Sequence, residues 1–221
     1  MKLNRFLIKL GLAFLLFGQT VHGFAEDAEI ANTRAKAERG DADAQFLLGY
    51  YYAVGQGVAK DEVEAVKWYR KAAEQNLAAA QFNLGSCYDN GQGVAKNMAE
   101  AVKWYQKAAD QNLAEAQFNL GVCYKRGEGV AQNEVEAVKW YRKAAEQNYA
   151  TAQFNLGLCY IRAQGLAQDD VEGYKWFLLS SAQGFEQAKD SVTKLEAALS
   201  PEQIAEGKRR ANNWLKQHKK S

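Results

Sequence analysis

The sequence predicts an all-α fold, a solenoid of stacked helix-turn-helix units, and three observations carry that prediction. The chain repeats itself without gaps over four units of 36 residues, at 42–77, 78–113, 114–149 and 150–185. Helix-forming Ala, Gln, Glu, Lys and Leu dominate, and there is one proline. Apolar residues recur at helical spacing on both sides of a glycine-containing break. Self-similarity of this kind is typical of solenoids, in which each unit buries its apolar faces against its neighbours.

Residues 1–25 predict a secretory signal peptide. Basic residues are followed by an apolar run at 10–18, which is shorter than the ~20 residues that span a bilayer, and by small residues at Gly23 and Ala25 where cleavage is expected. We therefore expect a periplasmic or secreted protein with no stable membrane insertion after cleavage. The remaining chain has 25 basic and 26 acidic residues, a balance that does not favour nucleic-acid binding.

Residues 26–41 predict an N-terminal capping helix, because the stretch "EIANTRAKAERG" has the pattern of an isolated second helix that ends in a glycine. Inside a unit, the pattern "AxAQFNLGxCYxx" predicts the first helix. In the third unit its apolar face contains Ala116, Leu120 and Cys123. The motif "GxGVA" then ends this helix, since glycine permits positive φ.

Asn133 has the spacing of an N-cap for the second helix of the third unit, and Glu136 lies three residues later, where a capping box needs it. Asn148 predicts the left-handed turn that ends this helix. After the repeats, residues 186–221 predict C-terminal capping helices and a basic tail. Ser200 and Pro201 are the expected N-cap and first residue of the last helix.

Three evenly spaced cysteines, Cys87, Cys123 and Cys159, fall at the tenth position of their units. Equivalent residues of stacked helices lie ~8–10 Å apart, whereas a disulfide needs Cα atoms within ~7 Å. We expect buried free thiols that fill the core. Their spacing is the repeat period and matches no metal-ligand pattern, so neither a metal site nor a cofactor is expected.

The repeated pattern A-x-A-x-x-x-L-G-x-x-Y-x-x-G-x-G-V, followed by A-x-x-W-Y-x-K-A-A, resembles the Sel-one-like repeat, a relative of the tetratricopeptide repeat. The resemblance covers the four units, and the segment "SPEQIAEGKRRA" is also similar to that family. It implies a right-handed α-solenoid whose first helices line a concave side, and it implies binding and scaffolding in place of one shared reaction. We therefore predict that the protein is not an enzyme. The fourth unit departs from the pattern, with Ala163 in place of the first loop glycine and Gly173 in place of alanine.

A second stripe of the first helix, at positions 2, 5, 6, 9, 12 and 13, faces the concave groove by this resemblance. Repeated phenylalanines and asparagines lie along it, and a row of amides is suited to holding an extended chain. Lysine and arginine add positive charge in the third and fourth units. The predicted partner-binding residues are Phe82, Asn83, Phe118, Asn119, Lys125, Arg126, Phe154, Asn155 and Arg162.

We therefore predict a monomeric periplasmic scaffold that binds a peptide segment or helix of another protein in its concave groove. One alternative is a secreted, virulence-type binder of a host protein. Another is a weak β-lactam- or peptidoglycan-directed enzyme, because Ser191 and Lys194 match a Ser-x-x-Lys motif and some cysteine-rich members of the resembled family are linked to β-lactam binding. The companion Lys-Thr-Gly motif is missing, and no histidine of the repeats could serve as a base.

Overall fold

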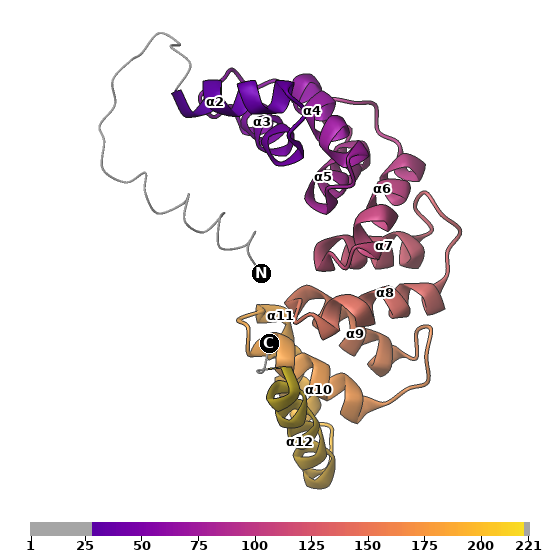
Figure 1. Cartoon of the computed structure of the whole chain (residues 1–221). Coiled ribbons are helices and arrows are strands. Elements are labelled where there is room, and N and C mark those ends of the chain that lie inside the picture. The colour runs from indigo at the N-terminus through magenta and orange to yellow at the C-terminus, as the bar shows by residue number, and fades with distance from the viewer. Residues whose placement is uncertain (1–27, 219–221) are drawn as a thin grey trace.

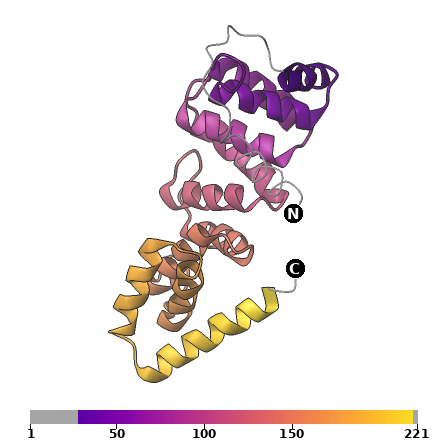
Figure 2. The ribbon, with the colours of Figure 1, turned by 90° about the vertical axis from the view of Figure 1, so that its left-hand side faces the viewer.

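The computed structural model describes residues 28–218, and within them it contains α-helices and no strand, which confirms the all-α prediction. The predicted signal peptide lies outside the described residues. The helices follow an arc that opens to one side (Figure 1), and Figure 2 shows the same stack from that side. They are α2 (Ala28–Glu38), α3 (Ala42–Val54), α4 (Glu62–Glu74), α5 (Ala78–Asn90), α6 (Met98–Asp110), α7 (Ala114–Arg126), α8 (Glu134–Glu146), α9 (Ala150–Arg162), α10 (Asp170–Ser181), α11 (Glu186–Glu196) and α12 (Pro201–His218).

Each unit is a helical hairpin, and each second helix also packs on the first helix of the next unit. A glycine at the eighth position brings the two helices of a hairpin close together. A Cβ atom on Gly121 would lie 2.7 Å from two ring carbons of Tyr141 and 3.2 Å from the carbonyl oxygen of Ala137. The same relation recurs at Gly49, Gly85 and Gly157. The glycine is therefore a packing requirement that is repeated in every unit.

The predicted apolar faces form a core that runs through the stack. In the third unit Ala116, Leu120 and Cys123 of α7 are buried in one cluster with Tyr105 of α6 and Trp140 of α8. The three cysteines are buried and unpaired, as predicted. Burial raises the pKa of Cys123 to about 12, and the nearby carboxylate of Asp89 acts in the same direction. These thiols therefore remain protonated at neutral pH and act as small apolar side chains.

The predicted N-caps are present, but the capping box is only half formed within the repeats. The Asn133 Oδ1 atom accepts a hydrogen bond from the Glu136 N–H at 3.1 Å. The Asn133 N–H donates instead to the carbonyl oxygen of Tyr124 at 2.8 Å, so it does not need the Glu136 side chain. Before α12 both bonds exist, because the N–H of Ser200 donates to Gln203 Oε1 at 2.9 Å and the Gln203 N–H donates to Ser200 Oγ at 3.3 Å.

One end of the stack is covered by α2, and the other is covered by α11 and α12. α2 packs on α3, in the place that a second helix would take, and α12 packs on α10. The guanidinium of Arg210 on α12 forms ion pairs with Glu172 at 3.1 Å and Asp169 at 3.4 Å. Among the described residues, no helix has the length and hydropathy needed to cross a membrane.

Candidate functional site

The candidate site is the stripe at positions 2, 5, 6, 9, 12 and 13 of α3, α5, α7 and α9, called here the first-helix stripe. Its phenylalanines are half-buried and pack on neighbouring rings. The centroid of Phe118 lies 5.7 Å from that of Tyr141 and 5.6 Å from that of Tyr149. Phe154 makes the equivalent contacts with Phe177 and Phe185. The phenylalanines therefore form an apolar floor and leave only part of each ring accessible.

The asparagine row is held by contacts within the chain. The side chain of Asn119 lies beside the hydroxyl of Tyr105 in the preceding unit and acts to lower its pKa, and Asn83 has the same relation to Tyr69. Asn155 donates instead to the carbonyl oxygen of Thr151 at 2.9 Å. A primary amide has two N–H donors and two acceptor lone pairs, so each asparagine has hydrogen-bonding capacity beyond its internal contact.

The tyrosine hydroxyls below this row remain protonated. Burial raises the pKa of Tyr105 far above its ordinary value, and the carboxylate of Asp89 adds to that increase. The Tyr105 hydroxyl donates to Asp89 Oδ2 at 3.1 Å. The hydroxyl thus bonds an acidic side chain of the second unit and lies beside the Asn119 amide of the third unit.

The predicted basic residues lie in the last turns of α7 and α9. Arg126 and Arg162 are exposed and Lys125 is half-buried. Arg126 pairs loosely with Glu128, at 3.8 Å between exposed side chains. Eight residues separate Phe118 from Arg126, which is about 12 Å along a helix. The long loops that follow α7 and α9 lie along the outer edge of the arc (Figure 1). The structure therefore separates the basic residues from the aromatic and amide part of the stripe.

The sequence reasoning missed a row of arginine–tyrosine contacts between units. Arg142 on α8 donates to the hydroxyl of Tyr160 on α9 at 2.9 Å, and its guanidinium carbon lies 5.9 Å from the ring centroid. The same pair recurs at Arg34 and Tyr52 and at Arg70 and Tyr88. The sequence contains a sign of this row, because an arginine precedes each of these tyrosines by 18 residues. In the second unit Gln106 stands in place of the arginine.

A second missed feature is a chain of glutamine amides. Gln117 is buried, and its Nε2 donates to the Ala109 carbonyl oxygen at 3.2 Å and to Asn112 Oδ1 at 3.1 Å. Its Oε1 accepts from Gln147 Nε2 at 2.7 Å. Equivalent glutamine pairs recur in the other units. Glutamine at positions 4 and 34 of all four units could have indicated this network, which fixes the position of each unit on the next.

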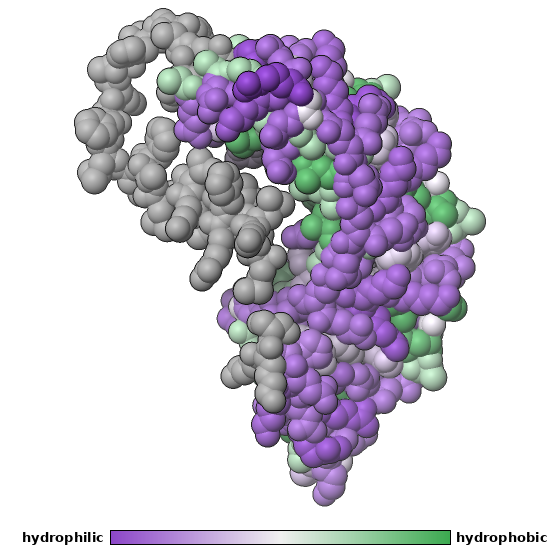
Figure 3. Space-filling view, viewed as in Figure 1, coloured by the Kyte–Doolittle hydropathy of each residue, from purple (hydrophilic) through white to green (hydrophobic). Residues whose placement is uncertain are grey.

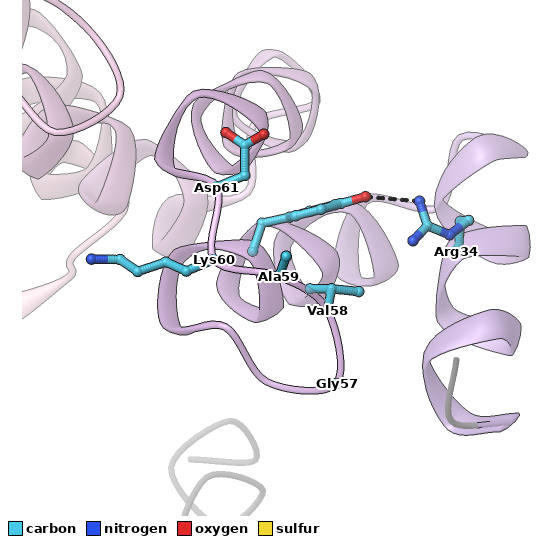
Figure 4. Close-up of a pocket in the computed structure, with 7 residues that line it drawn as sticks. Arg34, Gly57, Val58, Ala59, Lys60 and Asp61 are labelled. Carbon is cyan, nitrogen blue, oxygen red and sulfur yellow. Dashed lines mark hydrogen bonds between the residues drawn. The ribbon is translucent and has the colours of Figure 1, made fainter. Parts of the chain in front are cut away.

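A pocket of about 440 Å³ lies outside the stripe, between α2 and the loop of the first unit. Arg34, Tyr52 and the loop at 57–61 line it (Figure 4). In the second unit, the equivalent loop glycine, Gly93, lies against the carbonyl of Glu62 at the start of α4. In the first unit the corresponding glycine, Gly57, lies against the side chain of Ile30 on α2. The pocket thus marks the end of the stack.

The two residues of the Ser-x-x-Lys motif lie on α11. The Ser191 hydroxyl donates to the carbonyl oxygen of Gln187, one turn earlier, at 2.9 Å, and Lys194 is exposed. This bond is the ordinary contact of a helical serine with its own backbone. Between residues 28 and 218, no cluster of side chains has the composition of a metal site.

A stack of helical hairpins with a continuous core and a repeated outward stripe defines a helical-repeat protein. The chain belongs to the Sel1 repeat family, whose model matches residues 42–77, 78–113, 114–149 and 150–185. Sel1 repeat proteins generally mediate protein–protein interactions and are typically non-enzymatic scaffolds.

Two solved structures are similar over most of this chain. The first is c5321, a protective antigen of uropathogenic Escherichia coli with an SLR fold. It is 36% identical with a TM-score of 0.77, and the match covers 85% of this chain and 41% of that one. The second is a Sel1 repeat protein from Oxalobacter formigenes, 36% identical with a TM-score of 0.71, covering 87% and 81% respectively. The chain thus spans about two fifths of the length of c5321. None of the curated proteins compared with it matches.

Proposed function

We propose that this chain is an exported scaffold that receives a segment of a partner protein along its first-helix stripe. One observation carries the proposal: four first helices repeat the same outward face one unit apart, with a shared aromatic floor and side chains that differ at its edge. The second and third units differ at 11 of 36 positions, and four of these lie on the stripe at positions 2, 9, 12 and 13. A common scaffold with a tailored surface is what a specific binding module requires.

The shape of the stack supports a groove as the place of binding. Hydrophobic side chains lie on the hollowed side of the arc, over α5 and near α7, and others lie along its outer edge (Figure 3). An extended segment lying there would cross several units, and the asparagine amides have spare donors and acceptors to offer its backbone. The partner in this proposal is another protein of the cell envelope. A host protein replaces it if the chain is secreted.

The test is capture of partners from an envelope extract by the chain from residue 26 onward. The native form is compared with a stripe variant carrying Asn83→Ala, Asn119→Ala and Asn155→Ala. A matched control changes three exposed asparagines of the capping helices, Asn32→Ala, Asn212→Ala and Asn213→Ala. Circular dichroism verifies that all three forms are folded.

A protein retained by the native and control forms and lost by the stripe variant supports the proposal. Equal recovery from all three forms contradicts it and moves the binding surface away from the stripe. The cellular location is measured separately, by following the native chain in periplasmic and culture-medium fractions. Accumulation in the medium would replace the envelope partner by one outside the cell.

A further inference from the structure

The charge of the first-helix stripe changes from one end of the stack to the other. Its last turn is apolar in the first unit, acidic and amide-bearing in the second, and basic in the third and fourth. The side chains at positions 12 and 13 are, in order, Ala53 and Val54, Asp89 and Asn90, Lys125 and Arg126, and Ile161 and Arg162. The three cations occupy the last turns of two first helices that are one unit apart.

These cations lack the glutamate partners that the lysines of the second helices have. Lys67, Lys103 and Lys139 each form an ion pair with a glutamate three residues earlier, at 2.8 Å or less. Across residues 28–218, by contrast, neither Lys125 nor Arg162 has a carboxylate partner, and the contact of Arg126 with Glu128 is long and exposed. The positive charge of this patch is therefore available to a carboxylate from outside the chain.

Two of the cations lie near one buried sulfur atom, and all three follow apolar side chains by about one turn. Burial raises the pKa of Cys159, Lys125 and Arg162 act to lower it, and Glu134 acts to raise it, so both cations lie within electrostatic reach of this sulfur. Val122 and Leu158 precede the cations by one turn on the same helix faces and are half-buried. In the second unit this position is Ser86. Only the third and fourth units therefore combine an apolar side chain at this position with cations one turn later.

We infer that the third and fourth units bind an acidic protein segment, in which carboxylates flank an apolar side chain. The apolar side chain lies against Val122 and Leu158, and the carboxylates pair with Lys125, Arg126 and Arg162. Asp89 repels an acidic residue one unit earlier, which restricts the acidic part of the segment to this end of the stack. This inference rests on the proposed function, because it specifies the segment that the same stripe receives.

The test uses an array of random linear 12-residue peptides as the probe. The native chain is compared with the variant Lys125→Glu, Arg126→Glu, Arg162→Glu. The matched control is Lys36→Glu, Lys96→Glu, Lys194→Glu, which changes the net charge equally at exposed lysines that have no ion pair among the described residues. The strongest peptide is then titrated by fluorescence anisotropy at low and high salt. Heparin and phosphatidylglycerol vesicles are tested in parallel.

We expect the native and control forms to select peptides enriched in Asp and Glu beside Leu, Ile or Phe. The patch variant should bind the chosen peptide at least tenfold more weakly, and high salt should weaken binding to the native form. Peptide binding without acidic enrichment, or with equal loss in both variants, overturns the inference and leaves the proposed function standing. If no peptide binds, both fail. Patch-dependent binding to heparin or vesicles alone overturns the assignment to a protein segment.

Discussion

The glycine at the eighth position offers a test of how the hairpins are packed. Gly121 lies inside α7, where helix propensity alone predicts that Gly121→Ala would stabilise the protein by roughly 1 kcal/mol. The added Cβ would lie 2.7 Å from two ring carbons of Tyr141, closer than such atoms approach in folded proteins. The Tyr141 ring is 1% exposed and packs on Phe118, so it cannot move into solvent.

Overpacking of a filled core costs about 1–3 kcal/mol, so the steric cost should outweigh the gain in propensity. We expect Gly121→Ala to lower the free energy of unfolding by about 1 kcal/mol, and by at most about 2 kcal/mol. For a chain of this size, that is a decrease of a few degrees in Tm, roughly 2–4 °C per kcal/mol. Urea unfolding followed by circular dichroism at 222 nm measures the change directly.

A double-mutant cycle separates the ring contact from other effects. Tyr141→Leu removes the ring carbons that the new Cβ would meet, so Gly121→Ala should cost much less in that background. A coupling of about 1 kcal/mol between the two substitutions is expected for groups in direct contact. Stabilisation by Gly121→Ala alone, or strict additivity of the two changes, would refute the argument from close packing.

Three further predictions follow from the repeats. Ala163 has φ 53°, in the region that glycine adopts more easily, so Ala163→Gly should raise the midpoint of thermal unfolding slightly; an unchanged or lower midpoint would show that the loop holds no strain. Gln117→Leu should cost about 2–3 kcal/mol in urea unfolding, since it leaves buried hydrogen-bonding groups of its neighbours unpaired, whereas exposed Gln92→Leu should have little effect. The pKa of Cys123 is raised to about 12 in the folded state, so its contribution to stability is complete below its unfolded pKa of ~8.5 and is lost as the pH rises from there toward about 12. Cys123→Ala should therefore reduce the decline of unfolding free energy above pH 9, and an identical decline in both forms would contradict the burial argument.

The repeat period made most of the local structure predictable. Asn133 caps its helix because a short polar side chain at that position reaches the free N–H groups of the first turn. This contact is local and does not depend on the rest of the fold. Asn148 adopts φ 64° for an equally local reason. The burial of the cysteines followed from their place on an apolar helix face. These features depend on spacing along one helix, and spacing is visible in the sequence.

Contacts across facing helices were not predictable in the same way. The fourth unit has Gly173 where the others have alanine, a departure that has no explanation in the sequence alone. In the structure, a Cβ on Gly173 would lie 2.6 Å from the Cδ1 atom of Ile161 on α9. The larger isoleucine and the missing methyl group thus compensate each other across the hairpin. Such pairing depends on how the helices cross, and a single sequence does not contain that geometry.

The same limitation applies to the candidate site. Repetition placed Asn83 and Asn119 on an outward stripe, but it could not show that each amide lies beside a tyrosine hydroxyl of the preceding unit and acts on its pKa. It also grouped Lys125 with these amides, although the basic residues lie a helix turn or more away from them. The binding role of the stripe therefore stays a prediction, with its charge distribution as the most specific part.

The glutamine chain has a consequence for how the length of this protein can change. Each buried glutamine is satisfied by groups from the unit before it and from the end of its own unit, and every junction uses the same residue types. Excision of residues 78–113 would join Leu77 to Ala114, and Gln117 would then meet Asn76 as Gln81 does now. Excision of a fraction of a unit that removes one junction would place different residues opposite the buried glutamine. Removal or addition of whole 36-residue units therefore preserves the network, so the length available along a partner can change in steps of one unit.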